Sequence, residues 1–328
     1  MIVRDEEYFL RQCLEGVKDF VDEIIIVDTG SKDKTKEIAK EFTDKIYNFQ
    51  WQDDFAAARN FSLEKAIHDW ILVLDADEII EKKDLKKIRE IIKDTKYDAF
   101  YLIQRNYGKK SSVKWKKVEK KTKYTKDYEF YLRNPIMRLF RKGTKYCGVV
   151  HEVVDNYVKD NDMKSATLEI PIHHYVDEKK GNTLKKRQLR YLKIAEKKLK
   201  EEPNGRLYAT AAAIIIKFKG DYEKATDYFK KAIGYKYKIN ECKEGLAECY
   251  IALKKFQEAY DLYKELYKQG HLSPSLCNNM ANLLVMHKHY EPALRLLKLA
   301  LAESPDKDRI KKNIIALEET IKKKDKKN

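Results

Sequence analysis

In the stretch Trp70-Ile71-Leu72-Val73-Leu74-Asp75-Ala76-Asp77-Glu78, an apolar run ends abruptly in three carboxylates. Five consecutive large apolar residues predict a strand that is buried on both faces. Such a strand delivers the residues after it to the ligand-binding edge of an open α/β sheet. Two acids at positions i and i+2 behind it can present oxygens to one divalent cation, Mg²⁺ or Mn²⁺, which often completes its shell with phosphate. Taken alone, the stretch is equally typical of an acidic turn or a helix start.

A second strand of the same design lies upstream. Residues 23–28 form a short apolar run that ends in Asp28 and precedes a predicted helix over residues 34–42. Between the two strands, the apolar positions of residues 53–66 fit a helix, and this helix carries Arg59. Two acid-tipped strands with a cationic side chain between them suit a phosphate ester that binds together with a metal ion.

Two other phosphate-binding designs are excluded by the sequence. No early strand is followed by the Gly-x-Gly-x-x-Gly turn of dinucleotide-binding proteins, and the chain has no Gly-Lys-Ser/Thr turn of a phosphate loop.

Several motifs occur in order along the first half of the chain. They are Arg4-Asp5-Glu6-Glu7, Val27-Asp28-Thr29-Gly30-Ser31, Ala58-Arg59-Asn60 and Leu74-Asp75-Ala76-Asp77-Glu78, followed by Arg138-Leu139-Phe140-Arg141, Gly148-Val149-Val150-His151-Glu152 and Ile172-His173-His174-Tyr175. The first four resemble the signatures of family 2 inverting glycosyltransferases with the GT-A fold, an α/β Rossmann-like fold with a mostly parallel central sheet. The last three resemble the subgroup in which tetratricopeptide repeats follow the GT-A domain. That subgroup includes bacterial enzymes that glycosylate peptides and enzymes that act on surface polysaccharides.

The resemblance implies roles for individual residues of these motifs. Asp28 would face the base or ribose of a nucleotide sugar, and Arg59 would lie near the nucleotide and its diphosphate. Asp75 and Asp77 would form the Asp-x-Asp pair, in which the second acid binds the metal directly. In an inverting transfer, one further carboxylate takes the proton of the acceptor while the cation stabilises the departing nucleoside diphosphate.

Glu152 is the candidate for this catalytic base. It follows a glycine-containing run that resembles a strand, and it lies beside His151, which would orient it or contact phosphate. A surface pair at a strand end is the alternative interpretation of these two residues, and Asp155 is the alternative base.

Two neighbouring histidines end another predicted strand. Because side chains alternate along a strand, one of His173 and His174 should point inward and the other outward. In the family that this chain resembles, the histidine before the tyrosine lies near the donor. This favours His174 as a third metal ligand or a diphosphate contact, with a core histidine as the alternative interpretation.

The beginning of the chain departs from the family pattern. Members usually have several more apolar residues in the first strand, whereas only Met1-Ile2-Val3 are present here. Either this strand is unusually short or the native chain starts upstream, and the intact mass of the native protein would distinguish the two.

The second half of the chain repeats itself with a period of 34 residues, which is the tetratricopeptide period. Small residues that would let paired helices approach recur with this period, as do aromatic residues that would fill the gap between the helices. The recurring sets are Ala213, Ala247 and Ala281; Ala225, Ala259 and Ala293; and Tyr222, Phe256 and Tyr290. Three repeats meet the usual minimum for a stable stack, and aromatic residues at helical spacing are more typical of a core than of a ligand site.

These patterns predict four segments. We expect a GT-A catalytic domain over residues 1–178, a linker helix over 179–204, three tetratricopeptide repeats over 205–305, and a capping helix with a basic tail over 306–328. The stop signal Glu202-Pro203-Asn204-Gly205 marks the seam before the repeats.

The composition is typical of a soluble globular protein with a strongly basic charge of +16. Residues 109–126 contain nine lysines and one acid, which predicts a basic flap on the acceptor side of the active site. Binding of nucleic acid or anionic lipid is the alternative, but no nucleic-acid motif accompanies the lysines. Five cysteines without a Cys-x-x-Cys pair indicate a reducing compartment, and no apolar run reaches the roughly 18 residues of a membrane span, so we expect a cytoplasmic protein.

The sequence therefore predicts a metal-dependent inverting glycosyltransferase. It would use Mg²⁺ or Mn²⁺ and move a sugar from a nucleotide-sugar donor, expected to be a UDP-sugar, to a peptide, protein or glycan acceptor held partly by the repeats. The alternative is an interaction scaffold with an inactive GT-A domain whose repeats bind a partner. A sugar nucleotidyltransferase is disfavoured because its Gly-rich, Arg/Lys-bearing signature is missing.

Overall fold

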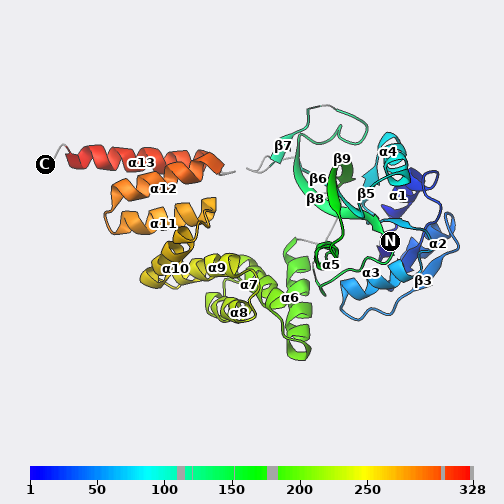
Figure 1. Ribbon diagram of the computed structural model, residues 1–328, viewed down its shortest axis with the longest axis horizontal. Helices are drawn as coiled ribbons and strands as arrows, with labels where there is room; N and C mark the ends of the chain where they lie inside the picture. Colours follow the sequence, from blue (N-terminus) through cyan, green and yellow to red (C-terminus); the bar gives the residue numbers. More distant parts are fainter. Residues whose placement is uncertain (109–114, 120, 151, 176–183, 304–306, 326–328) are drawn as a thin grey trace. The chain divides into compact units, whose positions relative to one another are not determined.

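The computed structural model describes residues 1–108, 115–119, 121–150, 152–175, 184–303 and 307–325 (Figure 1). The chain divides into two compact units, Met1–Asn182 and Thr183–Asn328. The first unit mixes helices and strands, and the second is built from helices. None of the described helices in either unit is both long enough and apolar enough to cross a membrane.

The first unit alternates strands and helices before it turns to long strands. Its elements are β1 (Ile2–Val3), α1 (Leu10–Val17), β2 (Ile26–Asp28), α2 (Thr35–Lys40), β3 (Ile46–Asn48), α3 (Phe55–Glu64), β4 (Trp70–Leu72), β5 (Glu78–Ile80), α4 (Lys82–Lys93), β6 (Ala99–Gly108), β7 (Trp115–Lys117), β8 (Phe130–Arg141), α5 (Asp155–Asp160) and β9 (Ser165–His174). The predicted helices over residues 34–42 and 53–66 correspond to α2 and α3. Asp54 caps the amino end of α3 by accepting a hydrogen bond from the Ala57 amide at 2.9 Å.

The strands form two sheets. The order in the first is β1-β2-β3, with all strands parallel, and the path of the second is β4-β8-β6-β9-β5, with β7 paired to β8. Among the described strands of the second sheet, only β6 and β9 are parallel neighbours, so the α/β domain has a mixed arrangement and not the mostly parallel sheet that was expected. The expectation of a mostly parallel sheet followed from the resemblance to the GT-A fold. The long strands β6 and β8 pair antiparallel, and β4 joins them at the edge of β8.

The apolar run that precedes the acids is only partly a strand. Trp70–Leu72 form β4 and are half-buried, whereas Val73 and Leu74 are buried and lie after the strand. The prediction of a strand buried on both faces is therefore wrong for β4, because one side of Trp70–Leu72 borders a cavity described below. The run nevertheless carries the acids beyond the end of the strand, since Glu78 begins β5.

The second unit contains the predicted helix pairs. Its elements are α6 (Leu184–Glu201), α7 (Gly205–Phe218), α8 (Tyr222–Gly234), α9 (Ile239–Ala252), α10 (Phe256–Lys268), α11 (Pro274–Met286), α12 (Tyr290–Glu303) and α13 (Lys307–Asp325). Helices α8, α10 and α12 start at Tyr222, Phe256 and Tyr290, so the repeat of 34 residues in the sequence is a repeat of helix pairs.

The alanines of the repeats pack as expected except at one position. Ala225, Ala259 and Ala293 are fully buried, and so is Ala247. Ala213 is exposed, however, because the buried face of α7 is formed by its neighbours, among them Ala212 and Ile214. The first repeat thus uses a different set of small residues for its core.

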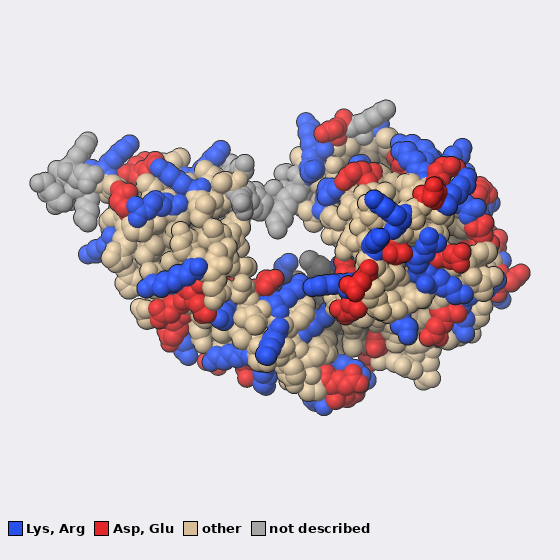
Figure 2. Space-filling model, viewed as in Figure 1, with Lys and Arg blue, Asp and Glu red and all other residues tan. Residues whose placement is uncertain are grey.

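Charged side chains of both signs are interspersed over the face of the molecule shown in Figure 2. Many of the surface lysines pair with nearby acids, for example Lys87 with Asp84 at 3.0 Å and Lys231 with Asp227 at 2.8 Å. The prediction of a basic flap falls partly on residues 109–114 and 120, which lie outside the described residues, and it stays a prediction.

Candidate active site

The acids after β4 lie in one tight turn. The Glu78 amide donates to the Asp75 carbonyl at 3.0 Å, and the Asp75 amide donates to Oε2 of Glu78 at 2.9 Å. Glu78 is fully buried, and burial raises the pKa of its carboxyl group. The two reciprocal bonds fix the backbone between Asp75 and Glu78, and so they fix the place from which Asp77 projects.

Two arginines hold the carboxylate of Asp75. Nη2 of Arg59, on α3, lies 2.9 Å from Oδ1, and Nη2 of Arg138, on β8, lies 2.6 Å from Oδ2. The same nitrogen of Arg138 is 2.8 Å from Oε1 of Glu78. Burial alone would raise the pKa of Asp75, but Arg138 and Arg59 outweigh it and hold this pKa well below its usual range. Both oxygens of Asp75 are thus engaged by arginines, which makes it a poorer candidate for a metal ligand than Asp77.

The structure brings Glu152 to the same cluster. Its Oε1 lies 2.6 Å from Nε of Arg59, the arginine that also binds Asp75. Asp155, the alternative base, accepts a hydrogen bond from the hydroxyl of Tyr101 at 2.7 Å, and burial with this bond raises the pKa of Tyr101 to about 12. His151 lies outside the described residues.

Asp77 and His174 are in contact. Oδ2 of Asp77 lies 3.0 Å from Nε2 of His174, although 97 residues separate them in the sequence. Burial by itself would lower the pKa of His174, but the contact with Asp77 outweighs it and raises this pKa above its usual value. The arrangement joins the second acid of the Asp-x-Asp pair to the histidine that was predicted as a metal ligand.

The neighbouring histidine is part of the core, as strand alternation predicts. His173 is buried, its Nδ1 lies 2.7 Å from the hydroxyl of Tyr107, and Tyr124 stacks on its ring with 5.0 Å between the ring centroids. Burial lowers the pKa of His173 to about 4, so the ring is neutral at pH 7.

Asp28 is buried at the end of β2 and is engaged by its own turn. One carboxylate oxygen accepts from the Gly30 amide at 3.0 Å, and both oxygens lie 3.2 Å from the Ser31 amide. Lys36 approaches the same carboxylate at 3.4 Å. In this structure Asp28 shapes the loop after β2, and its predicted contact with a nucleotide stays a prediction.

Asp77 and His174 are compatible with a small divalent cation whose other ligands are water and oxygens of the substrate. Among the described residues, no group of three or more His, Cys, Asp or Glu side chains forms a complete metal site. Mg²⁺ and Mn²⁺ need no such group, because they commonly bind one or two protein ligands together with water and phosphate oxygens. Asp77 offers the carboxylate oxygen that these ions prefer, and the imidazole of His174 lies beside it at 3.0 Å.

Four residues at or beside this site were not predicted: Arg138, Glu78, Gln104, which donates to Glu78, and Asn106, which contacts His174. Arg138 and Glu78 lie inside motifs that were quoted, but nothing local in the sequence says that they pair. Gln104, which is buried, and Asn106, which is half-buried, lie at alternate positions of β6, a strand whose buried residues are otherwise mostly apolar. Two amide side chains at positions i and i+2 of an otherwise apolar strand lie on one face and need hydrogen-bond partners there. This pattern could have identified Gln104 and Asn106 as candidate site residues.

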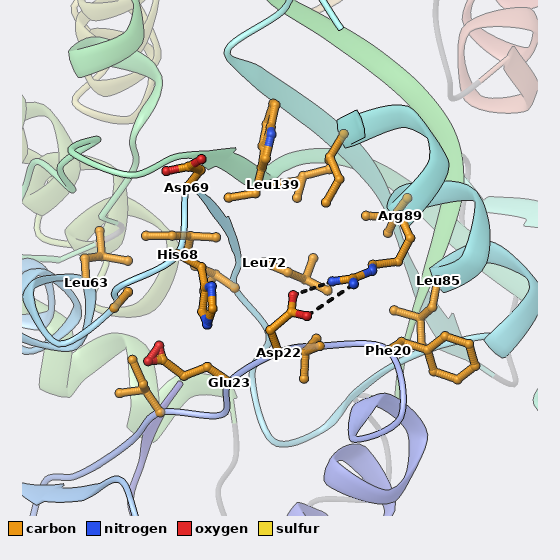
Figure 3. A pocket seen from close by; sticks show the side chains of 18 of the residues that line it. Phe20, Asp22, Glu23, Leu63, His68, Asp69, Leu72, Leu85, Arg89 and Leu139 are labelled. Atoms are coloured by element: carbon orange, nitrogen blue, oxygen red, sulfur yellow. Dashed lines mark hydrogen bonds and ion pairs between the residues drawn. The ribbon is translucent and has the colours of Figure 1, made fainter. Parts of the chain in front are cut away.

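A cavity of about 390 Å³ lies away from this cluster, at the amino ends of β2 and β4 (Figure 3). Leu63, Leu72 and Leu139 contribute apolar lining, and an ion pair between Asp22 and Arg89 lies among the lining side chains. The residues that line it include none of the predicted site residues. The predicted acids Asp28, Asp75 and Asp77 lie at the carboxyl end of β2 or after β4.

Comparison with known proteins assigns the first unit. Residues 1–151 match the family model described as glycosyl transferase family 2. The SPbeta prophage-derived glycosyltransferase SunS of Bacillus subtilis is 26% identical over 245 residues, which cover 74% of this chain and 54% of that protein. A TPR repeat-containing protein of Synechococcus elongatus is 46% identical over 104 residues, 32% of this chain and 26% of that protein.

Among solved structures, TarS of S. aureus matches with a TM-score of 0.45 and 13% identity over 79% of this chain and 53% of that chain. This chain spans about a quarter and about half of the length of the two curated relatives. The family match over the first unit and the helix pairs of the second lead to one assignment: the chain carries a glycosyltransferase family 2 domain fused to tetratricopeptide repeats.

Proposed function

We propose that this protein transfers a sugar from a nucleotide-sugar donor, a UDP-sugar, to a peptide, protein or glycan acceptor, with inversion at the anomeric carbon and with the help of Mg²⁺ or Mn²⁺. The observation that carries the proposal is the acid cluster, which we define as Asp75, Asp77, Glu78, Glu152, Arg59, Arg138 and His174. These residues converge from five separate segments of the first unit, whose residues 1–151 match family 2.

The charge of the acid cluster supports a role for a cation. Four carboxyl groups are served by two guanidinium groups and one imidazole. A nucleoside diphosphate would add further negative charge to a region that is already short of positive charge. A divalent cation held by Asp77 and His174 would neutralise the charge that develops on the departing diphosphate. Arg59 would lie near the nucleotide, with Asp28 beside the base or ribose.

Glu152 is the proposed catalytic base. It would accept the proton of the attacking acceptor group while the bond between the sugar and the diphosphate breaks. Its contact with Arg59 fixes it relative to Asp75, because one guanidinium group binds both carboxylates. Asp155, held by Tyr101, is the alternative base.

The acceptor is proposed from the domain organisation. Tetratricopeptide repeats form extended surfaces that suit a polymer better than a small molecule. The B. subtilis relative is named as a glycosyltransferase, which supports glycosyl transfer without naming the acceptor. We therefore propose a peptide, protein or glycan chain that the repeats hold in part.

The variant Asp77→Ala tests the metal assignment. It should lower sugar transfer and donor hydrolysis by more than about 100-fold, because the cation loses its carboxylate ligand, while the circular dichroism spectrum stays that of the wild type. Asp94→Ala is the matched control, since this exposed acid follows α4 outside the acid cluster. Turnover near the wild-type rate in purified Asp77→Ala would refute the metal assignment.

Calorimetric titration with uridine diphosphate, with and without Mn²⁺, separates the enzyme from the scaffold alternative. A functional donor site should bind the nucleotide more tightly when Mn²⁺ is present, because the cation bridges the protein and the diphosphate. An interaction scaffold with an inert domain would show no such dependence on the metal.

A further inference from the structure

Strand β6 carries two amide side chains, Gln104 and Asn106, on one face. Residues two apart on a strand point to the same side, and Gln104 is buried. A buried amide that leaves its donors or acceptors unpaired is costly, so the partners of these two amides are informative. They form one chain of hydrogen bonds that runs from Glu78 to His174.

The contacts of Glu78 determine which group of each amide acts as donor in this series of hydrogen bonds. Its Oε1 accepts hydrogen bonds from Nη2 of Arg138 at 2.8 Å and from Nε2 of Gln104 at 2.6 Å, and its Oε2 accepts from the Asp75 amide. Because Oε1 serves as an acceptor for a guanidinium group, the side of Gln104 that faces it must be the NH₂ group. The oxygen of Gln104 is therefore turned away from Glu78.

The second amide continues in the same direction. Oε1 of Gln104 accepts from Nδ2 of Asn106 at 3.3 Å and from Nδ2 of Asn134 at 3.1 Å. With its NH₂ group turned to Gln104, Asn106 presents Oδ1 to Nδ1 of His174 at 2.5 Å. An amide oxygen can only accept a hydrogen bond, so Nδ1 of His174 carries a hydrogen.

The sheet register makes this contact possible. Strands β6 and β9 are parallel, and Asn106 is aligned with His174 while Arg105 is aligned with His173. A shift of one residue would bring His173 to Asn106 and turn His174 to the other face. With Nδ1 held by Asn106, the other ring nitrogen, Nε2, faces the carboxylate of Asp77 at 3.0 Å and donates its hydrogen to it. A cation bound between the two side chains would replace that hydrogen.

We propose that Gln104 and Asn106 are positioning residues that fix the orientation of His174 and reserve its Nε2 for the divalent cation. This inference rests on the proposed function, because it concerns the cation that Asp77 and His174 would bind. Metal-binding histidines generally donate their second ring N–H to an oxygen, and loss of that oxygen typically weakens metal affinity by about 10- to 100-fold. Here a relay of two amides supplies the oxygen and keeps it pointed at the ring.

The test measures Mn²⁺ affinity of the full-length chain in saturating uridine diphosphate, by electron paramagnetic resonance of the free ion. Asn106→Ala should weaken Mn²⁺ binding by about 10- to 100-fold. Asn106→Asp should restore most of the affinity, because a carboxylate accepts the same hydrogen from His174. Asn134→Ala is the matched control: it also removes a donor to Gln104 but does not contact His174, so its affinity should match that of the wild type.

Each outcome decides between the inference and the proposed function. If the wild type binds Mn²⁺ and Asn106→Ala binds it equally well, the relay has no role and the proposed function stands. If Asn106→Ala and Asn106→Asp lose affinity equally while both remain folded by circular dichroism, the oxygen of residue 106 is not what matters, and the inference is overturned. If the wild type itself shows no Mn²⁺ binding with the nucleotide, the metal-dependent function fails and the inference fails with it.

Discussion

Asp33 shows how much one side chain contributes to the loops at the carboxyl ends of β1 and β2. Its Oδ2 accepts from the Glu7 amide at 3.0 Å, and its Oδ1 accepts from the amide of Thr35 at 2.9 Å and from the Thr35 hydroxyl. Burial alone would raise the pKa of Asp33, but these bonds outweigh it and lower this pKa. Asp33 therefore ties the loop after β1 to the start of α2.

Asp33→Ala should lower the free energy of unfolding by about 2 kcal/mol at pH 7, because the amides of Glu7 and Thr35 lose an ionised acceptor. Since the folded-state pKa lies below the unfolded value, the charge-dependent part of this contribution is fully present above the unfolded pKa. It is lost as the pH falls through the folded pKa, so the difference between wild type and variant should shrink in acid. Urea unfolding at several pH values between 7 and 3 measures the difference in free energy of unfolding between wild type and variant. Asp44→Ala, which removes an exposed acid, is the control. A difference that grows in acid would contradict the assignment.

At the scale of elements, the contact between α8 and α9 depends on a glycine. A Cβ atom added to Gly245, in α9, would lie 2.5 Å from Cζ of Phe229, a buried ring of α8. The corresponding atom on Gly234, the last residue of α8, would meet nothing within 4 Å. The two glycines therefore differ in packing although both are helical.

Gly245→Ala should destabilise the helical unit by about 1–3 kcal/mol, because the helices must separate or the ring must move. Gly234→Ala should be neutral or stabilising by up to about 1 kcal/mol, since alanine favours the helix and has room there. Urea unfolding followed by circular dichroism at 222 nm compares the two variants. Equal stability of both would mean that α8 and α9 pack less closely than this structure has them.

At the scale of the whole molecule, each unit has cores of its own. One apolar cluster lies wholly within the helical unit and joins residues of α9 to α13, whereas the clusters around Leu102 and Phe140 lie within residues 1–182. A unit that contains its own core can be expected to fold without the other.

Residues 183–328 expressed alone should therefore give a helical circular dichroism spectrum and a cooperative urea transition. The fragment of residues 1–182 should in turn retain metal-linked binding of uridine diphosphate, because the acid cluster lies entirely within it. Aggregation or loss of helical signal in the 183–328 fragment, under conditions in which the full chain is folded, would show that the repeats need the first unit.

The sequence by itself determined the local elements and the order of the domains. Strands, helices and the repeat of 34 residues follow from periodicity and turn chemistry, which act over a few neighbouring residues. For the same reason the acids at the ends of β2 and β4 could be recognised, and the comparison with family 2 confirms the family that their motifs suggested. The sequence did not indicate that β4 would pair antiparallel with β8 or that Ala213 would be exposed.

Only the tertiary structure decided which of these side chains meet. Arg138 binds Asp75 across 63 residues of sequence, His174 meets Asp77 across 97, and Asn106 meets His174 across 68. Each contact depends on the register between strands that are distant in the chain, and a slip of one residue would turn the side chain to the other face. Register is set by the packing of the whole sheet and not by any local pattern, which is why the amide relay behind His174 became visible only in the folded molecule.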